Sequence, residues 1–138
     1  MPAEIIAKKL EQIKELMGEL TRLLKAPLSE FMKDMVVIRA AERNFQLMVD
    51  LAVDVNTQLL QDRNKPTPDT YRQSFLYLAK ENLLDASLAE QLSITAKLRN
   101  ILVHEYDFEE DFAKFYVSVK KSLPWYEKYI TDVLNIIK

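Results

Sequence analysis

The feature that most constrains this sequence is its shortage of residues that make tight turns. The 138 residues include one glycine and five prolines. Sandwiches and doubly wound sheets need many more turn positions, so this composition favours long helices with few connections. Gly18 stands alone inside a helical pattern, which excludes a glycine-rich phosphate-binding loop. P-loop and dinucleotide-binding folds are therefore ruled out.

Apolar residues recur at steps of three and four along most of the chain, as they do on one face of an α-helix. The predicted helices cover about 2–25, 29–62, a short stretch after the loop 64–69, about 87–104, and a last stretch from about 107 to the end. Their predicted N-terminal signals are Ser29, Thr67 followed by Pro68, Ser87 in a capping box, and the acidic run that begins at Asp107. Pro124 is expected to kink or restart the last helix.

These elements predict an all-α fold. The expected architecture is an antiparallel four-helix up-and-down bundle with an additional kinked or split C-terminal helix. No repeat, low-complexity tract or linker divides the sequence. We therefore expect one domain that covers residues 1–138.

Composition also limits the chemistry. The chain has no cysteine and one histidine, so disulfide frameworks, thiolate sites and paired-histidine zinc sites are excluded, and neither a metal nor a cofactor is expected. The formal net charge of −2 gives no overall basic field for nucleic acid. Apolar runs are far too short for a membrane span, and the N-terminus does not resemble a secretory signal, so no membrane partner and a cytoplasmic location are expected.

Two polar residues, Glu42 and Asn56, fall within the apolar stripe of the second predicted helix. A buried carboxylate is costly unless it is paired. Arg39 lies three residues before Glu42 and Arg43 lies beside it, so pairing within the helix is possible. Glu42 and Arg43 are therefore candidate supporting residues of a polar site, although Glu42 at a wet edge of the stripe is equally compatible with the pattern.

The segment from Arg99 to Tyr106 (RNILVHEY) gathers a cation, an amide, an imidazole and a phenol at the end of a predicted helix. Asn100 and His104 are four residues apart and share a helix face, and the long side chain of Arg99 can reach round to them. An imidazole can transfer protons near neutral pH, and a guanidinium can stabilise charge on phosphate oxygens. RNA cleavage through the ribose 2′-hydroxyl needs little more than these two functions.

One histidine is too few for both the acid and the base of such a reaction. A two-fold homodimer that pairs two copies of the motif would supply both, so a composite site is expected. The simpler alternative is a capping histidine that hydrogen-bonds the last carbonyls of its helix, with Tyr106 as an anchoring residue. Spacing alone favours that capping interpretation.

The segment Arg99–Tyr106 resembles the motif of HEPN-domain proteins, an arginine, four residues, a histidine, one residue and a tyrosine, and specifically that of HepT-like toxins. The stretch Ala40–Gln46 and the pair Leu123-Pro124 are also similar to that group. The resemblance implies a dimeric helical bundle and a metal-independent endoribonuclease. It further implies Arg99, His104 and Asn100 as catalytic residues, and a small nucleotidyltransferase antitoxin that transfers AMP to Tyr106.

An acidic run lies beside the motif, where five of the seven residues from Glu105 to Asp111 are acidic. Like charge near RNA phosphates is unfavourable, so the run is expected either to be a solvated helix start or to bind a basic antitoxin surface. Two alternatives to a nuclease remain open. One is a non-catalytic subunit that binds nucleotide or substrate for a separate nucleotidyltransferase, and the other is a purely structural dimerisation bundle.

Overall fold

The computed structural model describes residues 3–103 and 111–138, and the regular structure in these ranges is entirely helical. The six described helices are α1 (Ala3–Leu23), α2 (Leu28–Phe31), α3 (Met35–Gln61), α4 (Tyr71–Lys80), α5 (Ala86–Val103) and α6 (Phe112–Ile137). This confirms the all-α prediction. None of the six has both the length and the apolar character needed to cross a bilayer.

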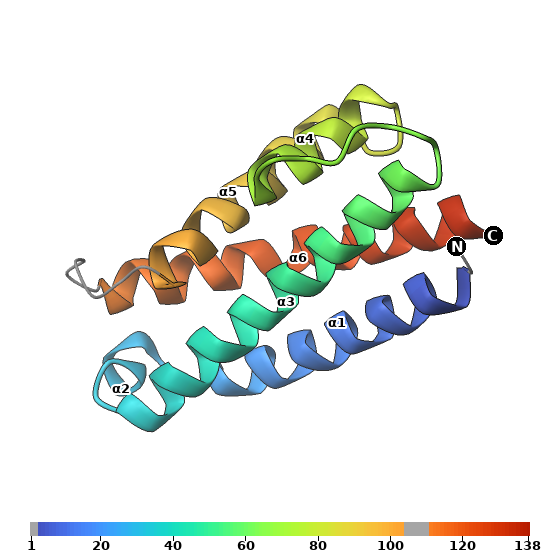
Figure 1. The fold of residues 1–138 in the computed structure, drawn as a ribbon. Coiled ribbons are helices and arrows are strands. Elements are labelled where there is room, and N and C mark those ends of the chain that lie inside the picture. Colours follow the sequence, from blue (N-terminus) through green and yellow to red (C-terminus); the bar gives the residue numbers. More distant parts are fainter. Residues whose placement is uncertain (1–2, 104–110) are drawn as a thin grey trace.

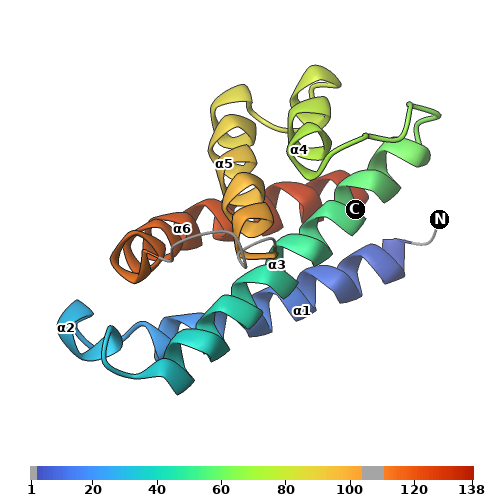
Figure 2. The same ribbon diagram turned by 60° about the vertical axis from the view of Figure 1, so that its left-hand side comes forward.

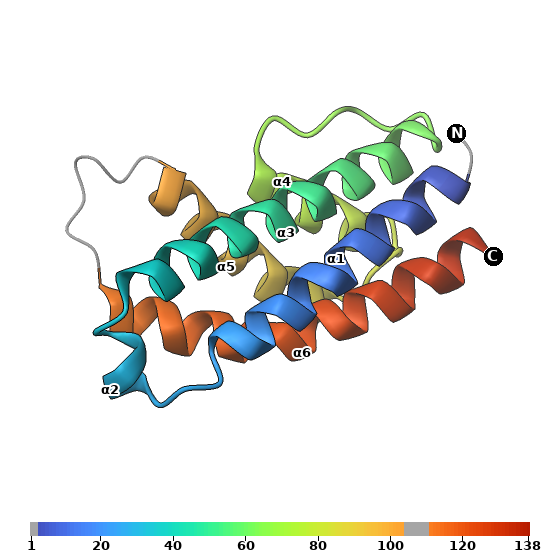
Figure 3. The ribbon, with the colours of Figure 1, turned by 90° about the horizontal axis from the view of Figure 1, so that it is seen from below.

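The four long helices run alternately up and down, as predicted for the bundle (Figure 1). The principal contacts join α1 to α3 and join α4 to α5. The helices α4 and α5 form a helical hairpin, which packs against the side of α3 opposite to α1 (Figure 2). Seen from below, α1 lies between α3 and α6 (Figure 3). The long helix α3 is therefore flanked by α1 on one side and by the α4–α5 hairpin on the other.

The core is built mainly on the apolar stripe of α3. Most of the predicted stripe is fully buried: Ile38, Phe45, Val49, Ala52, Asn56 and Leu59. Asn56 is tolerated there because its amide is paired on both sides. Its Nδ2 donates to Ser74 Oγ on α4 at 3.0 Å, and its Oδ1 accepts from the Tyr129 hydroxyl on α6. This polar contact therefore ties three helices together within the apolar core.

The predicted helix over 29–62 is wrong at its N-terminal end. The chain forms the short α2, breaks at Met32–Asp34, and begins α3 at Met35. Asp34 is extended, and its carboxylate accepts from Val37 N at 3.2 Å, so Asp34 rather than Ser29 caps the long helix. Phe31 is turned into the core against the rings of Phe115 and Tyr116, whereas Met35 is exposed.

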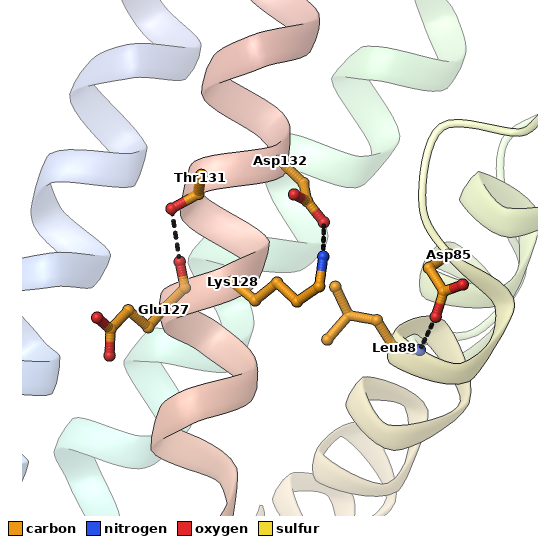
Figure 4. A network of polar contacts seen from close by, with 6 residues as sticks. All are labelled: Asp85, Leu88, Glu127, Lys128, Thr131 and Asp132. Carbon is orange, nitrogen blue, oxygen red and sulfur yellow. Dashed lines mark hydrogen bonds and ion pairs between the residues drawn. The ribbon is translucent and has the colours of Figure 1, made fainter.

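Two other helix starts also differ from the predicted ones. Thr70, not Thr67, caps α4 by accepting from Gln73 N at 3.1 Å, and Pro68 remains in the loop. Asp85, not Ser87, accepts from Leu88 N at the start of α5, at 3.2 Å (Figure 4). In each case, several residues whose side chains can cap a helix lie close together in the sequence.

Pro124 lies inside α6 and does not divide it, so of the two predicted alternatives, a kink or a restart, the restart does not occur. The helix continues through the proline because buried side chains on both sides of it, including Val119 and Tyr126, keep the same face on the core. Beyond the proline, polar pairs such as Lys128–Asp132, at 3.0 Å, lie along the helix (Figure 4). Asp111 caps α6 by accepting from Lys114 N at 2.9 Å, while the predicted start at Asp107 lies outside the described residues.

Candidate functional site

Arg99 lies near the end of α5, and its side chain crosses to the middle of α3. Its Nε donates to Asp50 Oδ1 at 2.9 Å. Arg99 is placed this way because it follows Thr95 and Ala96 on the buried face of α5, which lie four and three residues earlier. Only 16% of its side chain is exposed, and 29% of that of Asp50. The pair is therefore half-buried, where solvent screens a charge interaction less than at the surface.

Tyr71, the first residue of α4, covers one face of the same guanidinium. The Arg99 Cζ lies 4.4 Å from the centroid of the phenol ring, within the range of a cation–π contact. Burial raises the pKa of Tyr71 above its usual value of 10.0, and the nearby Asp50 carboxylate raises it further, while Arg99 acts in the opposite direction. Tyr71 is therefore a neutral phenol at physiological pH.

Asn100 completes the set of contacts around Arg99. Its Oδ1 accepts from Arg99 Nη1 at 3.2 Å. Within the described ranges, no hydrogen bond occupies the Nη2 of Arg99. Two of its five N–H groups thus meet protein oxygens, and three, both on Nη2 and the second on Nη1, are left for another acceptor.

The structure brings two of the predicted site residues, Arg99 and Asn100, into direct contact. His104 and Tyr106 lie outside the described residues, as does the acidic run up to Glu110. The catalytic roles of Arg99, Asn100 and His104 and the modification of Tyr106 therefore stay predictions.

Glu42 and Arg43 lie two turns earlier on α3 than Asp50, or about 12 Å along the helix axis. Glu42 pairs with Arg39 at 2.7 Å, as its spacing predicts, and its side chain is 11% exposed. It lines a largely apolar pocket of about 360 Å³ between α5 and α6, which Arg99 does not line. Arg43 is exposed. A supporting role for either residue stays a prediction.

Sequence reasoning missed Asp50 and Tyr71. The Tyr71 side chain packs against the core, as an apolar residue of a helix would, and nothing in the sequence pattern reveals the guanidinium on its ring. Asp50 gave a weak signal, because it is the one charged residue in the otherwise apolar run Leu47–Val53. Such a carboxylate needs a partner, but its identity depends on the fold.

The geometry suits the binding of an anion. A guanidinium fixed by a carboxylate and an aromatic face loses little further side-chain entropy when it binds a second acceptor. Its free Nη2 edge can donate to a phosphate oxygen and stabilise negative charge that develops on it. Within residues 3–103 and 111–138, no group of three or more acidic or imidazole side chains is placed to hold a metal ion.

Comparison with known proteins gives consistent matches over nearly the whole chain. The profile of the family described as "Ribonuclease HepT-like" matches residues 6–133. A tRNA nuclease HepT from Aphanizomenon flos-aquae is 28% identical over 94% of this chain and 87% of its own length. An mRNA nuclease HepT from Shewanella oneidensis is 27% identical over 75% of this chain and 77% of its own length. A solved structure of a tri-AMPylated Shewanella oneidensis HEPN toxin in complex with an MNT antitoxin superposes with a TM-score of 0.86, at 25% identity over 98% of this chain and 99% of that one.

Proposed function

The chain belongs to the family of HepT-like ribonucleases, and on that basis we propose that it is a metal-independent RNA endonuclease, the toxin of a two-gene toxin–antitoxin module. The observation that carries this proposal is the family match, which spans the whole segment Arg99–Tyr106. Two relatives named as HepT nucleases, one for tRNA and one for mRNA, support RNA as the substrate. We further propose that residues 1–138 act as one domain and that the cytoplasm is the site of action.

Cleavage uses the RNA itself as the nucleophile. The ribose 2′-oxygen attacks the adjacent phosphorus, the bond from phosphorus to the 5′-oxygen breaks, and the products carry a 2′,3′-cyclic phosphate and a 5′-hydroxyl. A His104 imidazole accepts the proton of the 2′-hydroxyl, and an imidazolium returns a proton to the leaving oxygen. Arg99 stabilises the charge on the phosphoryl oxygens, with Asn100 holding its Nη1.

Two imidazoles are needed, and each chain has one. The active unit is therefore a homodimer in which two copies of the motif meet across a two-fold axis. The solved HEPN toxin with which this chain superposes is in complex with an MNT antitoxin, which supports assembly with a partner protein as well.

The partner is a minimal nucleotidyltransferase antitoxin. It transfers AMP from ATP to the phenol oxygen of Tyr106, with release of pyrophosphate, and the added phosphate repels RNA beside the histidine. The tri-AMPylated state of the solved toxin supports this form of neutralisation. The acidic run from Glu105 to Asp111 is suited to bind a basic surface of such a partner.

A growth assay tests both proposals together. Wild-type protein is expected to arrest growth of its host, whereas Arg99→Ala and His104→Ala are not, since each removes a catalytic group. Coexpression of the nucleotidyltransferase should relieve the arrest by wild type but not by Tyr106→Phe, and mass spectrometry should find AMP on wild type only. Equal arrest by all variants would exclude catalysis by the motif. Tight nucleotide binding without RNA cleavage would instead favour the non-catalytic subunit.

A further inference from the structure

Three helices converge on the Arg99 guanidinium, and only one of the three carries the motif. Asp50 from α3 accepts from Nε, and the Tyr71 ring from α4 lies against one face. We propose that Asp50 and Tyr71 are positioning residues of the cleavage site, which fix the Arg99 guanidinium so that its Nη2 edge is presented to the RNA phosphate. This inference rests on the proposed function, because the phosphate is that of the RNA substrate.

The distribution of donors supports this role. Arginine has five N–H groups in one plane, and a carboxylate on Nε with an amide oxygen on Nη1 defines the orientation of that plane. The Tyr71 ring then blocks one side of the plane. What remains for a ligand is the pair of N–H groups on Nη2, with the second N–H of Nη1 beside them, approached from the side away from Tyr71. A long flexible side chain is thereby converted into a directed pair of donors.

The negative charge of Asp50 has a second consequence. Paired with Arg99, it lowers the net positive charge that RNA meets at the site, so Asp50 weakens ground-state binding while it improves orientation. Removal of the carboxylate should therefore separate the two effects. The rate of the chemical step should fall, and the affinity for RNA should stay equal or rise.

Steady-state cleavage of a fluorescent RNA by the full-length protein tests this separation. For Asp50→Ala we expect kcat to fall about 10- to 100-fold, as is usual for a misplaced catalytic group, with KM unchanged or lower. Asp50→Asn keeps a hydrogen-bond acceptor without the charge, so its kcat should lie between those of wild type and Asp50→Ala. A lower KM cannot result from a smaller folded fraction, which is measured in parallel by circular dichroism. A higher KM at unchanged kcat would overturn the inference.

The matched control is Asp54→Asn, one turn further along α3. Asp54 is exposed and pairs with Lys9 of α1 at 3.5 Å, not with Arg99. Because the charge change equals that of Asp50→Asn, any general electrostatic effect on RNA binding should appear in both variants. Loss of kcat should appear only at position 50. Equal losses in the two variants would contradict a specific role for Asp50.

A measurement on RNA-free protein makes the two proposals separable. The Nε–H signal of Arg99 in a nitrogen NMR spectrum is identified by its absence from Arg99→Lys. The Nε proton of Arg99 should exchange slowly with water in wild type and in Asp54→Asn. In Asp50→Ala it should exchange quickly. A wild type that cuts no RNA overturns the proposed function and the catalytic part of this inference. An Asp50→Ala variant with unchanged exchange and unchanged cleavage overturns the inference alone.

Discussion

Arg99 shows how one residue can be both buried and available for binding. A guanidinium that is 16% exposed would be strongly unfavourable without a partner, and the Asp50 carboxylate at 2.9 Å provides one. In the part of the chain that the structure describes, the contacts use Nε, Nη1 and one π-face, so the Nη2 donors stay unoccupied there. The same contacts that make Arg99 compatible with the fold therefore fix the orientation of its guanidinium.

Two buried tyrosines, Tyr126 and Tyr129, predict a loss of stability at alkaline pH. Burial raises the pKa of both hydroxyls well above the usual value of 10.0. The unfolded chain thus releases these protons at lower pH than the folded chain. Their contribution to stability is complete below about pH 10 and declines as the pH rises above it.

Urea unfolding from about pH 8 to about pH 11, followed by circular dichroism, measures this decline. Tyr126→Phe should show a smaller decline than wild type, and Thr95 would keep its bond to the Leu92 carbonyl at 2.6 Å. The same decline in wild type and Tyr126→Phe would show that the Tyr126 hydroxyl does not contribute.

At the scale of single residues, sequence reasoning identified the motif but not its surroundings. Arg99 and Asn100 are neighbours in the chain, so their contact follows from local spacing. Asp50 lies 49 residues from Arg99, and their contact depends on how α3 and α5 pack. An acidic residue inside an apolar run indicates that a partner is needed, but only the packing identifies that partner.

Helix starts are the elements that sequence reasoning located least well. The four described side-chain caps, Asp34, Thr70, Asp85 and Asp111, each accept from the backbone N–H three residues later. The periodic stripe correctly located the bodies of the helices, since burial determines them. The first turns of α3, α4 and α5 were misplaced because polar residues cluster there, and the choice between them is made by tertiary contacts such as the burial of Phe31.

As the cap of α3, Asp34 should contribute measurably to the free energy of unfolding. Asp34→Ala removes the acceptor for Val37 N and should lower the free energy of unfolding by about 1 kcal/mol, the usual effect of losing an exposed cap. Asp34→Ser retains an acceptor and should stay close to wild type, as should Lys33→Ala next to it. Urea denaturation compares the three variants. If Lys33→Ala and Asp34→Ala were equally destabilised, the cap would have no special role.

At the scale of the whole molecule, the proposed mechanism assigns to each bundle half of a catalytic site. One chain has a single histidine and a formal charge of −2, so neither a second imidazole nor a strong RNA-attracting field is available from the chain alone. The family match predicts both the helical fold and a nuclease. The architecture itself followed from composition, since a chain with one glycine has little choice other than long helices.

The central claim is that Arg99 and His104 of two chains form one ribonuclease site. The most direct test counts the 2′,3′-cyclic phosphate ends formed per wild-type chain while His104→Ala chains are mixed in before refolding. With a ninefold excess of the variant, a two-fold composite site predicts a fall to about one tenth, because most wild-type chains then pair with an inactive copy. An unchanged yield per wild-type chain, or no cyclic ends at any ratio, would contradict the claim.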